Sequence, residues 1–240
     1  MKIYTIEEGI QFIDEVTKRR YYGRLKGDKM YILEYFKYVI EHKKNVFKTA
    51  WKRGLYIHAI THDSSKFNLK EFMPYVNWFY GHSGVKLEKE YNKEQLNNNM
   101  SCLSRNYLEC KKNFNKAWKY HCTDNFHHWQ HWLDENKKPV NIPYKHLKQM
   151  IADWEGMALK FGDTAENYYL INYNKIKLTD NTRMTLEFEL GLNLSIIHNY
   201  GHTLEQFYKM YSEKEFMDKF SWIEGRYNVN LSKILGGKNE

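Results

Sequence analysis

The residues best suited to chemistry lie close together between positions 58 and 67, where the sequence reads HAITHDSSKF. If this segment is helical, His62 and Asp63 lie about 100° apart around the axis, so an imidazole nitrogen and a carboxylate oxygen can reach one metal ion. Lys66 follows on the same face. An ammonium group beside a metal ion is repelled unless an anion such as a phosphoryl group sits between them. The spacing therefore indicates phosphate chemistry at a metal, and the alternative is a solvated ion pair between Asp63 and Lys66.

The helix that precedes this segment carries a further candidate ligand. Apolar residues recur with helical spacing from Met30 to Arg53, and Gly54 ends the pattern. His42 lies three positions after Val39 and four before Val46, so we expect it to point into the core. Two antiparallel helices joined at Gly54 would bring His42 to His62. The alternative is a core histidine that is hydrogen-bonded to the backbone.

A second helix and the tract after it contain several histidines. From Ser101 an apolar face runs through Tyr107 and Ala117, and its next position is His121. Asp124 and Asn125 end the pattern, and the tract FHHWQHW at 126–132 follows. Histidine-rich tracts are typical of metal binding, so we expect the histidines of this tract to contact a metal ion or a substrate. The alternative is an aromatic core cluster with imidazoles as polar-tipped filler.

Asp153 is the last candidate ligand. Asn141-Ile142-Pro143 opens a helix whose apolar stripe includes Leu147, Ile151 and Trp154 and which Gly162 ends. Asp153 lies on the flank of that stripe, where an unpaired carboxylate is costly. It therefore completes either an ion pair or the metal site.

Between Phe67 and residue 101 the sequence predicts a short helix, a loop and a polar surface segment. Asn68 and Glu71 resemble a capping box that begins a helix through Trp78. His82 falls in the loop at 81–84 and is a spare ligand or substrate contact, or simply solvated. Residues 85–100 are polar and are expected to form a surface excursion or mobile lid.

The C-terminal third is harder to assign. Residues 186–196 read LEFELGLNLSI, whose period of two favours a strand. A single strand has nothing to pair with among helices, so we predict a helix. Thr203 with Gln206 and Ser212 with Glu215 predict two capped helix starts, followed by a short helix near Leu231.

Bulk composition limits the class of protein. The chain has 240 residues with 42% hydrophobic content and no long uncharged apolar run. Its N-terminus lacks the basic start and apolar centre of a signal peptide. These features predict a cytoplasmic protein without membrane contact. The three cysteines form no C-x-x-C pair and are expected to be reduced thiols. A net charge of +8 and 17% aromatic residues favour anionic partners. The basic residues are spread through the chain, and Lys43, Lys48, Arg53 and Lys112 are expected on solvated helix faces.

The candidates resemble a known signature in both type and order. That order is His42, His62-Asp63 with Lys66, His121, His127-His128 and Asp153, all on predicted helices. It resembles the H…HD…D pattern of the HD-domain superfamily of metal-dependent phosphohydrolases. The residues from 30 to 190 also resemble an uncharacterised domain family of Firmicutes and their phages, through THDSSKF at 61–67, NFHHWQHW at 125–132 and Asp153-Trp154 followed by Phe161-Gly162-Asp163.

The superfamily resemblance implies a set of residue roles. It makes His42, His62, Asp63 and Asp153 ligands of a first metal, with Asp63 bridging to a second metal held by His121 and His128. The gap between His121 and His128 is shorter than the superfamily usually shows, and His127 or His82 are the substitutes, otherwise assigned to the substrate. The implied cofactors are one or two divalent ions of Fe, Mn, Co, Ni or Zn. A metal-bound hydroxide would attack phosphorus while Lys66 steadies the phosphoryl charge.

The expected architecture is an all-α, HD-like helical bundle. Residues 1–29 form a lead-in helix and connection, 30–190 the metal-binding domain, and 191–240 a helical extension that packs on the domain or forms a homodimer. The expected substrate is an anionic small molecule, most plainly a nucleotide, in a bacterial cell or phage-infected host. Two alternatives stay open: a non-catalytic helical protein that binds nucleic acid or a nucleotide, and a di-iron oxygenase on an HD-like scaffold.

Overall fold

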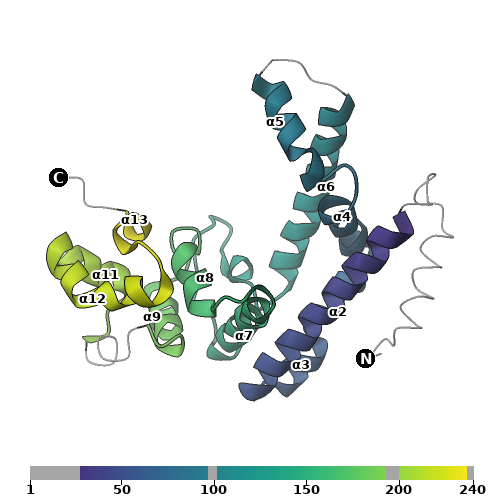
Figure 1. Cartoon of the computed structure of the whole chain (residues 1–240). Coiled ribbons are helices and arrows are strands. Elements are labelled where there is room, and N and C mark those ends of the chain that lie inside the picture. Colours follow the sequence, from purple (N-terminus) through teal and green to yellow (C-terminus); the bar gives the residue numbers. More distant parts are fainter. Residues whose placement is uncertain (1–27, 97–101, 193–199, 237–240) are drawn as a thin grey trace. The chain divides into compact units, whose positions relative to one another are not determined.

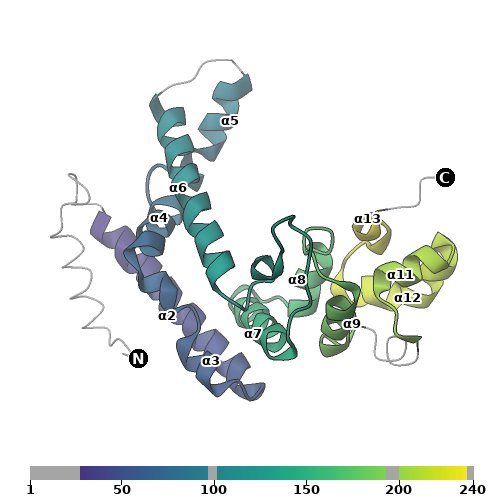
Figure 2. The same ribbon diagram turned by 180° about the vertical axis from the view of Figure 1, so that it is seen from behind.

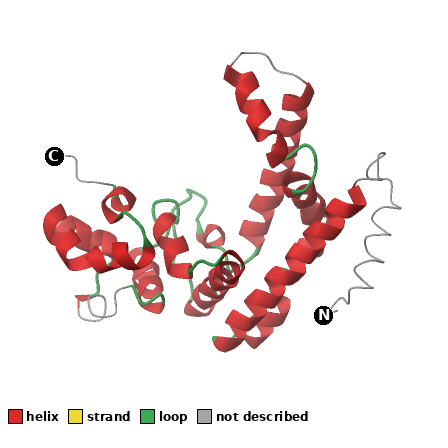
Figure 3. Ribbon diagram, viewed as in Figure 1, coloured by secondary structure: helices red, strands yellow, loops and turns green. Residues whose placement is uncertain are grey.

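The computed structural model describes residues 28–96, 102–192 and 200–236. Within these ranges the regular structure is helical and no strand is drawn (Figure 3), although Leu133 and Pro139 form one isolated antiparallel bridge. The predicted all-α fold is therefore confirmed. The predicted lead-in helix lies in residues 1–27, outside the described residues. None of the described helices combines the length and the apolar character needed to cross a membrane.

The chain divides into two compact units. The first unit comprises residues 1–44 and 60–124, and the second unit comprises residues 45–59 and 125–240. Helices α2 (Asp28–Lys52) and α3 (Tyr56–Thr61) each contribute residues to both units. The sequence-based boundaries after residues 29 and 190 stay a prediction.

The first unit is built on three packed helices, α2, α4 (Leu69–Phe79) and α6 (Cys102–Asp124). Figures 1 and 2 show α4 beside α6 from both sides, and the two helices share an extensive contact. Ile32, Phe72 and Ala117, one from each helix, lie in one buried apolar cluster. This cluster fixes α4 and α6 against the histidine-bearing part of α2.

The polar segment at 85–100, expected to form a surface excursion or mobile lid, is helical through residue 96, where the described range ends. Val85–Leu87 is one turn of 3-10 helix and Glu88–Leu96 forms α5. Helix α5 packs on α6, where the Tyr91 and Tyr107 rings lie 4.6 Å apart. Its composition gave little helical signal, because Tyr91 is the only residue of 88–93 that is not exposed.

Helix α4 begins at the predicted N-cap, Asn68, but the predicted capping box with Glu71 is not formed. The Asn68 side chain accepts a hydrogen bond from the backbone N–H of Lys70. Glu71 does not close the capping box, because its side chain is fully buried and its Oε2 lies 2.9 Å from Nδ1 of His121. The residue expected to cap the helix instead faces a histidine on α6.

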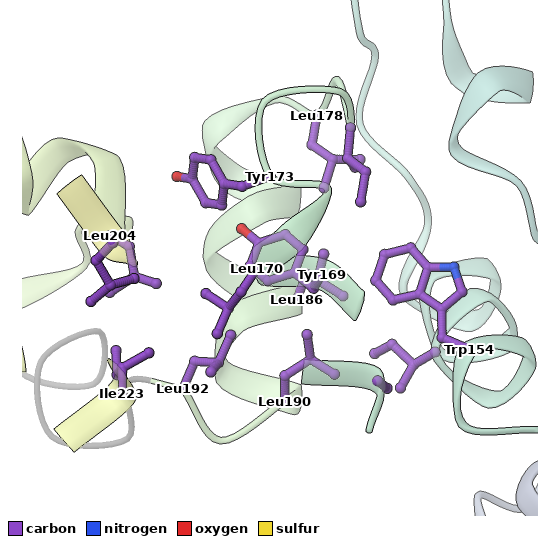
Figure 4. Close-up of a cluster of buried hydrophobic side chains, with 14 of the residues drawn as sticks. Trp154, Tyr169, Leu170, Tyr173, Leu178, Leu186, Leu190, Leu192, Leu204 and Ile223 are labelled. Atoms are coloured by element: carbon purple, nitrogen blue, oxygen red, sulfur yellow. The ribbon is translucent and has the colours of Figure 1, made fainter. Parts of the chain in front are cut away.

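The second unit has one large apolar core. Its helices are α7 (Tyr144–Phe161), α8 (Ala165–Ile171), α9 (Asp180–Glu189), α11 (Leu204–Met210), α12 (Glu213–Tyr227) and α13 (Leu231–Leu235). Figure 4 shows Trp154 of α7, Tyr169 of α8 and Leu186 of α9 in one cluster with Leu204 and Ile223. The last three helices thus share a core with α7, α8 and α9.

The ambiguous segment at 186–196 is helical where it is described. Helix α9 continues through Glu189 and stops before Gly191, which has a φ of 67°. The helix prediction is therefore confirmed for 186–189, whereas 193–196 lie outside the described residues. Both predicted capping boxes, at Thr203 and Ser212, are formed, and the expected short helix is α13.

Candidate metal centre

The chain turns sharply at Asp63. Helix α3 ends at Thr61, Asp63 has the left-handed conformation (φ 53°, ψ 24°), and residues Ser64–Phe67 form a 3-10 helix. The prediction that 58–67 is one helix is therefore wrong. Aspartate tolerates this conformation better than most residues because its short polar side chain bonds locally. In 3-10 geometry residues three apart eclipse each other, which places Lys66 over Asp63.

Three buried side chains converge after this turn. Nε2 of His42 lies 3.0 Å from Nε2 of His62, and both nitrogens face Oδ2 of Asp63, at 3.2 Å and 3.3 Å respectively. All three residues are at most 3% exposed. The predictions that His42 points inward and that the turn at Gly54 brings it to His62 are confirmed.

The spacing of these atoms fits a metal ion. Imidazole nitrogens and carboxylate oxygens bind transition metals at about 2.1 Å, and octahedral or tetrahedral angles then place the ligand atoms about 3.0 to 3.4 Å apart. The three observed separations, 3.0, 3.2 and 3.3 Å, lie within that range. The buried cluster of His42, His62 and Asp63 can therefore hold a metal ion on a two-histidine, one-carboxylate face.

Two lysines add positive charge at the same place. Nζ of Lys66 lies 2.5 Å from Oδ2 of Asp63, the oxygen that the two imidazoles face. Lys43, the neighbour of His42, donates a hydrogen bond to the backbone carbonyl of His62. Burial lowers the pKa of the Lys43 ammonium, while the Asp63 carboxylate acts to raise it. Lys43 was expected on a solvated helix face, and that prediction is wrong.

His121 approaches the other oxygen of Asp63. Its Nε2 lies 3.4 Å from Oδ1 of Asp63, and the side chain is completely buried, as its place in the apolar pattern predicted. On the far side of the ring, Nδ1 faces Oε2 of Glu71 at 2.9 Å. Ser65, two residues after Asp63, donates to Glu71 over 3.3 Å. The Asp63 carboxylate therefore has two imidazoles at one oxygen and a third at the other.

Two aromatic rings flank the imidazoles. Tyr38 stacks on His42 with centroids 6.5 Å apart, and Trp118 stacks on His121 at 6.0 Å. Tyr38 is half-buried and Trp118 is 40% exposed. The histidines thus lie beside partly accessible ring faces, which are surfaces on which a base can stack.

The remaining predicted residues belong to other segments of the sequence. His82 is exposed, and its Nε2 lies 3.0 Å from the Tyr31 hydroxyl. In the second unit, His127 is buried and His128 half-buried in the turn before the 3-10 helix Trp129–Trp132, with their rings 4.4 Å apart. Asp153 is buried on α7, as predicted. That His127, His128 or Asp153 completes the centre stays a prediction.

Two corrections follow for the local structure of the candidates. They were expected on helices, yet His62 lies in the turn after α3, and His127 and His128 lie in a turn as well. His42, His121 and Asp153 lie in α-helices, and Lys66 lies in a 3-10 helix. Turn positions let side chains approach from directions that a regular helix does not offer.

Glu71 is the residue at the centre that sequence reasoning missed. It was assigned to a helix cap because it follows Asn68 by three. A signal for burial was available, since Glu71 precedes Tyr75 by four residues and Trp78 by seven and so shares their apolar face of the helix. Both of those aromatic residues are buried in the structure.

Comparison with known proteins gives a family but no activity. The model described as "Family of unknown function (DUF5662)" matches residues 31–192. No curated protein and no solved structure matches the chain. The matched range contains the complete cluster of His42, His62, Asp63 and His121.

Proposed function

The chain belongs to this family of unknown function (DUF5662), and from its buried histidine–aspartate centre we propose that it is an HD-type, metal-dependent phosphohydrolase acting on a nucleotide or another phosphate ester. The observation that carries the proposal is the triangle of His42, His62 and Asp63 with the Lys66 ammonium on the same carboxylate oxygen. The ligands for a metal ion thus lie beside an ammonium group that can bind a phosphoryl oxygen.

The residues present fit one or two divalent ions of Fe, Mn, Co, Ni or Zn. His42, His62 and Asp63 would hold the first ion, and His121 with the other oxygen of Asp63 would contact a second. Such an ion supplies a lowered pKa for a bound water and polarises a phosphoryl oxygen. Residues from the second unit are expected to add ligands, as the sequence predicts for Asp153 and His128.

Lys66 supports an anionic substrate. The Lys66 side chain is only 12% exposed and its Nζ lies 2.5 Å from Oδ2 of Asp63, so an arriving cation would compete with the ammonium for that oxygen. Once released from Asp63, the Lys66 ammonium stays within one side-chain length of the centre. It can then neutralise the charge that gathers on phosphoryl oxygens. Lys43 keeps a second positive charge in place through the backbone of His62.

A nucleotide fits the centre better than a small phosphate ester does. The accessible Trp118 ring and the half-buried Tyr38 ring lie against two of the site imidazoles. A base can stack on such a ring, and stacking tolerates any base. The net charge of +8 favours association with polyanionic substrates over neutral ones.

Metal content and phosphate release test the proposal together. The protein as purified, or after reconstitution with Mn²⁺, Fe²⁺ or Co²⁺, is expected to bind at least one ion per chain and to release phosphate from a panel of nucleotides. Asp63→Ala removes the carboxylate shared by all the ligands and should lose both properties. His202→Ala, which alters a half-buried histidine whose ring contacts Phe207 in the second unit, is the matched control and should keep the metal. Stoichiometric metal in Asp63→Ala, or no metal in the wild type after reconstitution, would refute it.

One observation favours a second candidate. Two histidines and one carboxylate on a single face are also the ligand set of non-haem iron oxygenases. Iron-dependent consumption of dioxygen in the presence of a phosphorylated substrate, without phosphate release, would favour an oxygenase. Phosphate release under anaerobic conditions would exclude that reading, because hydrolysis needs no oxidant.

A further inference from the structure

Glu71 is buried against His121 in the core of the first unit. Helices α4 and α6, which carry the two residues, pack closely, and both side chains are completely buried. Oε2 of Glu71 lies 2.9 Å from Nδ1 of His121. A carboxylate excluded from water is unfavourable unless its charge serves an interaction, so its place beside a candidate ligand calls for a reason.

The contact decides where His121 carries its proton. An ionised carboxylate only accepts hydrogen bonds, so the 2.9 Å contact requires the proton on Nδ1. In the neutral imidazole, Nε2 then carries the lone pair that can bind a cation, and it lies 3.4 Å from Oδ1 of Asp63. Two electron-rich atoms at this distance repel unless a cation lies between them. Their separation equals the span of two ligands on one metal ion.

Ser65 ties this pair to the turn that carries Asp63. Its hydroxyl donates to Oε2 of Glu71 over 3.3 Å and lies 3.4 Å from Nδ1 of His121. Because Ser65 is only two residues from Asp63, one short segment positions the Asp63 carboxylate on one side of His121 and holds Glu71 on the other. The ring orientation of His121 is therefore determined from two sides.

We propose that Glu71 is a positioning residue that makes His121 a ligand of a second divalent cation on Oδ1 of Asp63. The inference rests on the proposed metal centre but not on phosphate hydrolysis. Hydrogen-bonded carboxylates behind metal-binding histidines fix the tautomer and raise the basicity of the ligand, and their loss weakens metal binding by about 10- to 100-fold. Glu71 itself touches neither cation nor substrate.

Metal titrations of four full-length proteins test the proposal. Cobalt is the probe, because its visible absorbance reports the ligands of each bound ion. The wild type should bind two Co²⁺ per chain in two steps. His121→Ala should lose the second step, and Glu71→Gln, which keeps the shape and removes the charge, should weaken that step about 10- to 100-fold. His202→Ala, which alters a histidine assigned neither to the metals nor to the substrate, should behave as wild type.

A purely structural role for Glu71 would give a different pattern. The proposal expects Glu71→Gln to leave the thermal stability of the metal-free protein unchanged or to increase it, since the substitution removes a buried charge. The second binding step should weaken all the same. Where Glu71→Gln does not fold, Ser65→Ala loosens the same clamp and should weaken the second step by a smaller factor. Wild-type affinity for the second ion in Glu71→Gln, or in Ser65→Ala when only that variant folds, overturns the inference.

The outcome separates this proposal from the proposed hydrolase. Two cobalt steps with the predicted losses, but no phosphate release from any nucleotide, uphold the role of Glu71 and remove the hydrolase. A single cobalt step in the wild type overturns the role of Glu71, even where phosphate release is intact.

Discussion

A metal ion and the Lys66 ammonium would compete for the same atom, oxygen Oδ2 of Asp63. The Lys66 ammonium lies 2.5 Å from it, and Nε2 of His42 and of His62 lie at 3.2 Å and 3.3 Å. A metal ion bound to the two imidazoles would take the place on this oxygen that Lys66 holds. The ammonium and the ion would repel each other strongly at such separations. Lys66 therefore stabilises the carboxylate before metal binds and opposes the metal afterwards.

This competition predicts opposite effects of one substitution. Lys66→Met should bind the first metal ion on the order of tenfold more tightly, because a neighbouring cation has been removed. Phosphate release should fall by about 10²- to 10³-fold, because the charge on the phosphoryl group loses its partner. Affinity is measured by metal titration and turnover by phosphate release at saturating metal.

Lys70→Met is the control for this test, since it removes the same charge from an exposed position at the start of α4. It should change neither quantity by more than a small factor. Weaker metal binding in Lys66→Met would show instead that the lysine is needed to hold Asp63 in its left-handed turn.

At the scale of elements, helical periodicity predicted the long helices and the direction of their polar residues. His42 and His121 fall in phase with apolar stripes, and both are buried at the centre. The turn at Asp63 was not predictable in this way, because aspartate is only tolerated in the left-handed region and does not require it. Glu71 satisfied a local capping pattern and a buried face at once, and the tertiary contact prevailed.

Helices α2 and α7 approach most closely within the second unit at Gly156. A Cβ atom there would lie 2.5 Å from Cγ2 of Val46 and 2.9 Å from its backbone nitrogen. Thr49 adds a 2.7 Å hydrogen bond to the carbonyl of Ala152 one turn earlier. The lack of a side chain at position 156 is thus what lets these two helices come together.

Gly156→Ala should therefore destabilise the protein despite the better helix propensity of alanine. We expect a loss of about 1 to 3 kcal/mol from overpacking, measured by urea denaturation. Gly225→Ala on α12 is the matched control, because nothing lies within 4 Å of the added Cβ and the substitution should stabilise by about 0.5 to 1 kcal/mol. Equal stabilisation by both variants would mean that α2 and α7 separate without cost.

At the scale of the whole molecule, the second unit depends on a buried polar network. Glu187 on α9 is completely buried, and its Oε1 accepts a 2.5 Å hydrogen bond from the Tyr169 hydroxyl of α8. Its Oε2 accepts from the backbone N–H of Leu204 at the start of α11. Arg183 donates to the same tyrosine hydroxyl at 3.0 Å. One carboxylate therefore joins three helices that share the core shown in Figure 4.

Burial makes this network sensitive to pH. Desolvation raises the pKa of Glu187 from 4.5 to about 7, against the opposing effects of the Tyr169 and Leu204 hydrogen bonds and of the Arg183 charge. Because the folded state holds its proton more tightly than the unfolded state, the stabilisation is complete below pH 4.5 and is lost as pH rises towards 7. The shift corresponds to on the order of 3 kcal/mol.

Stability measured against pH in a pair of proteins isolates this contribution. Other groups titrate in the same range, so the relevant quantity is the difference in unfolding free energy between the wild type and Glu187→Gln. Glutamine is neutral and keeps one oxygen for the tyrosine hydroxyl, although it cannot serve both donors. The advantage of the wild type should therefore be largest below about pH 4.5 and shrink by about 3 kcal/mol by about pH 8. An advantage that grows with pH would mean that the Arg183 charge outweighs burial and holds Glu187 ionised.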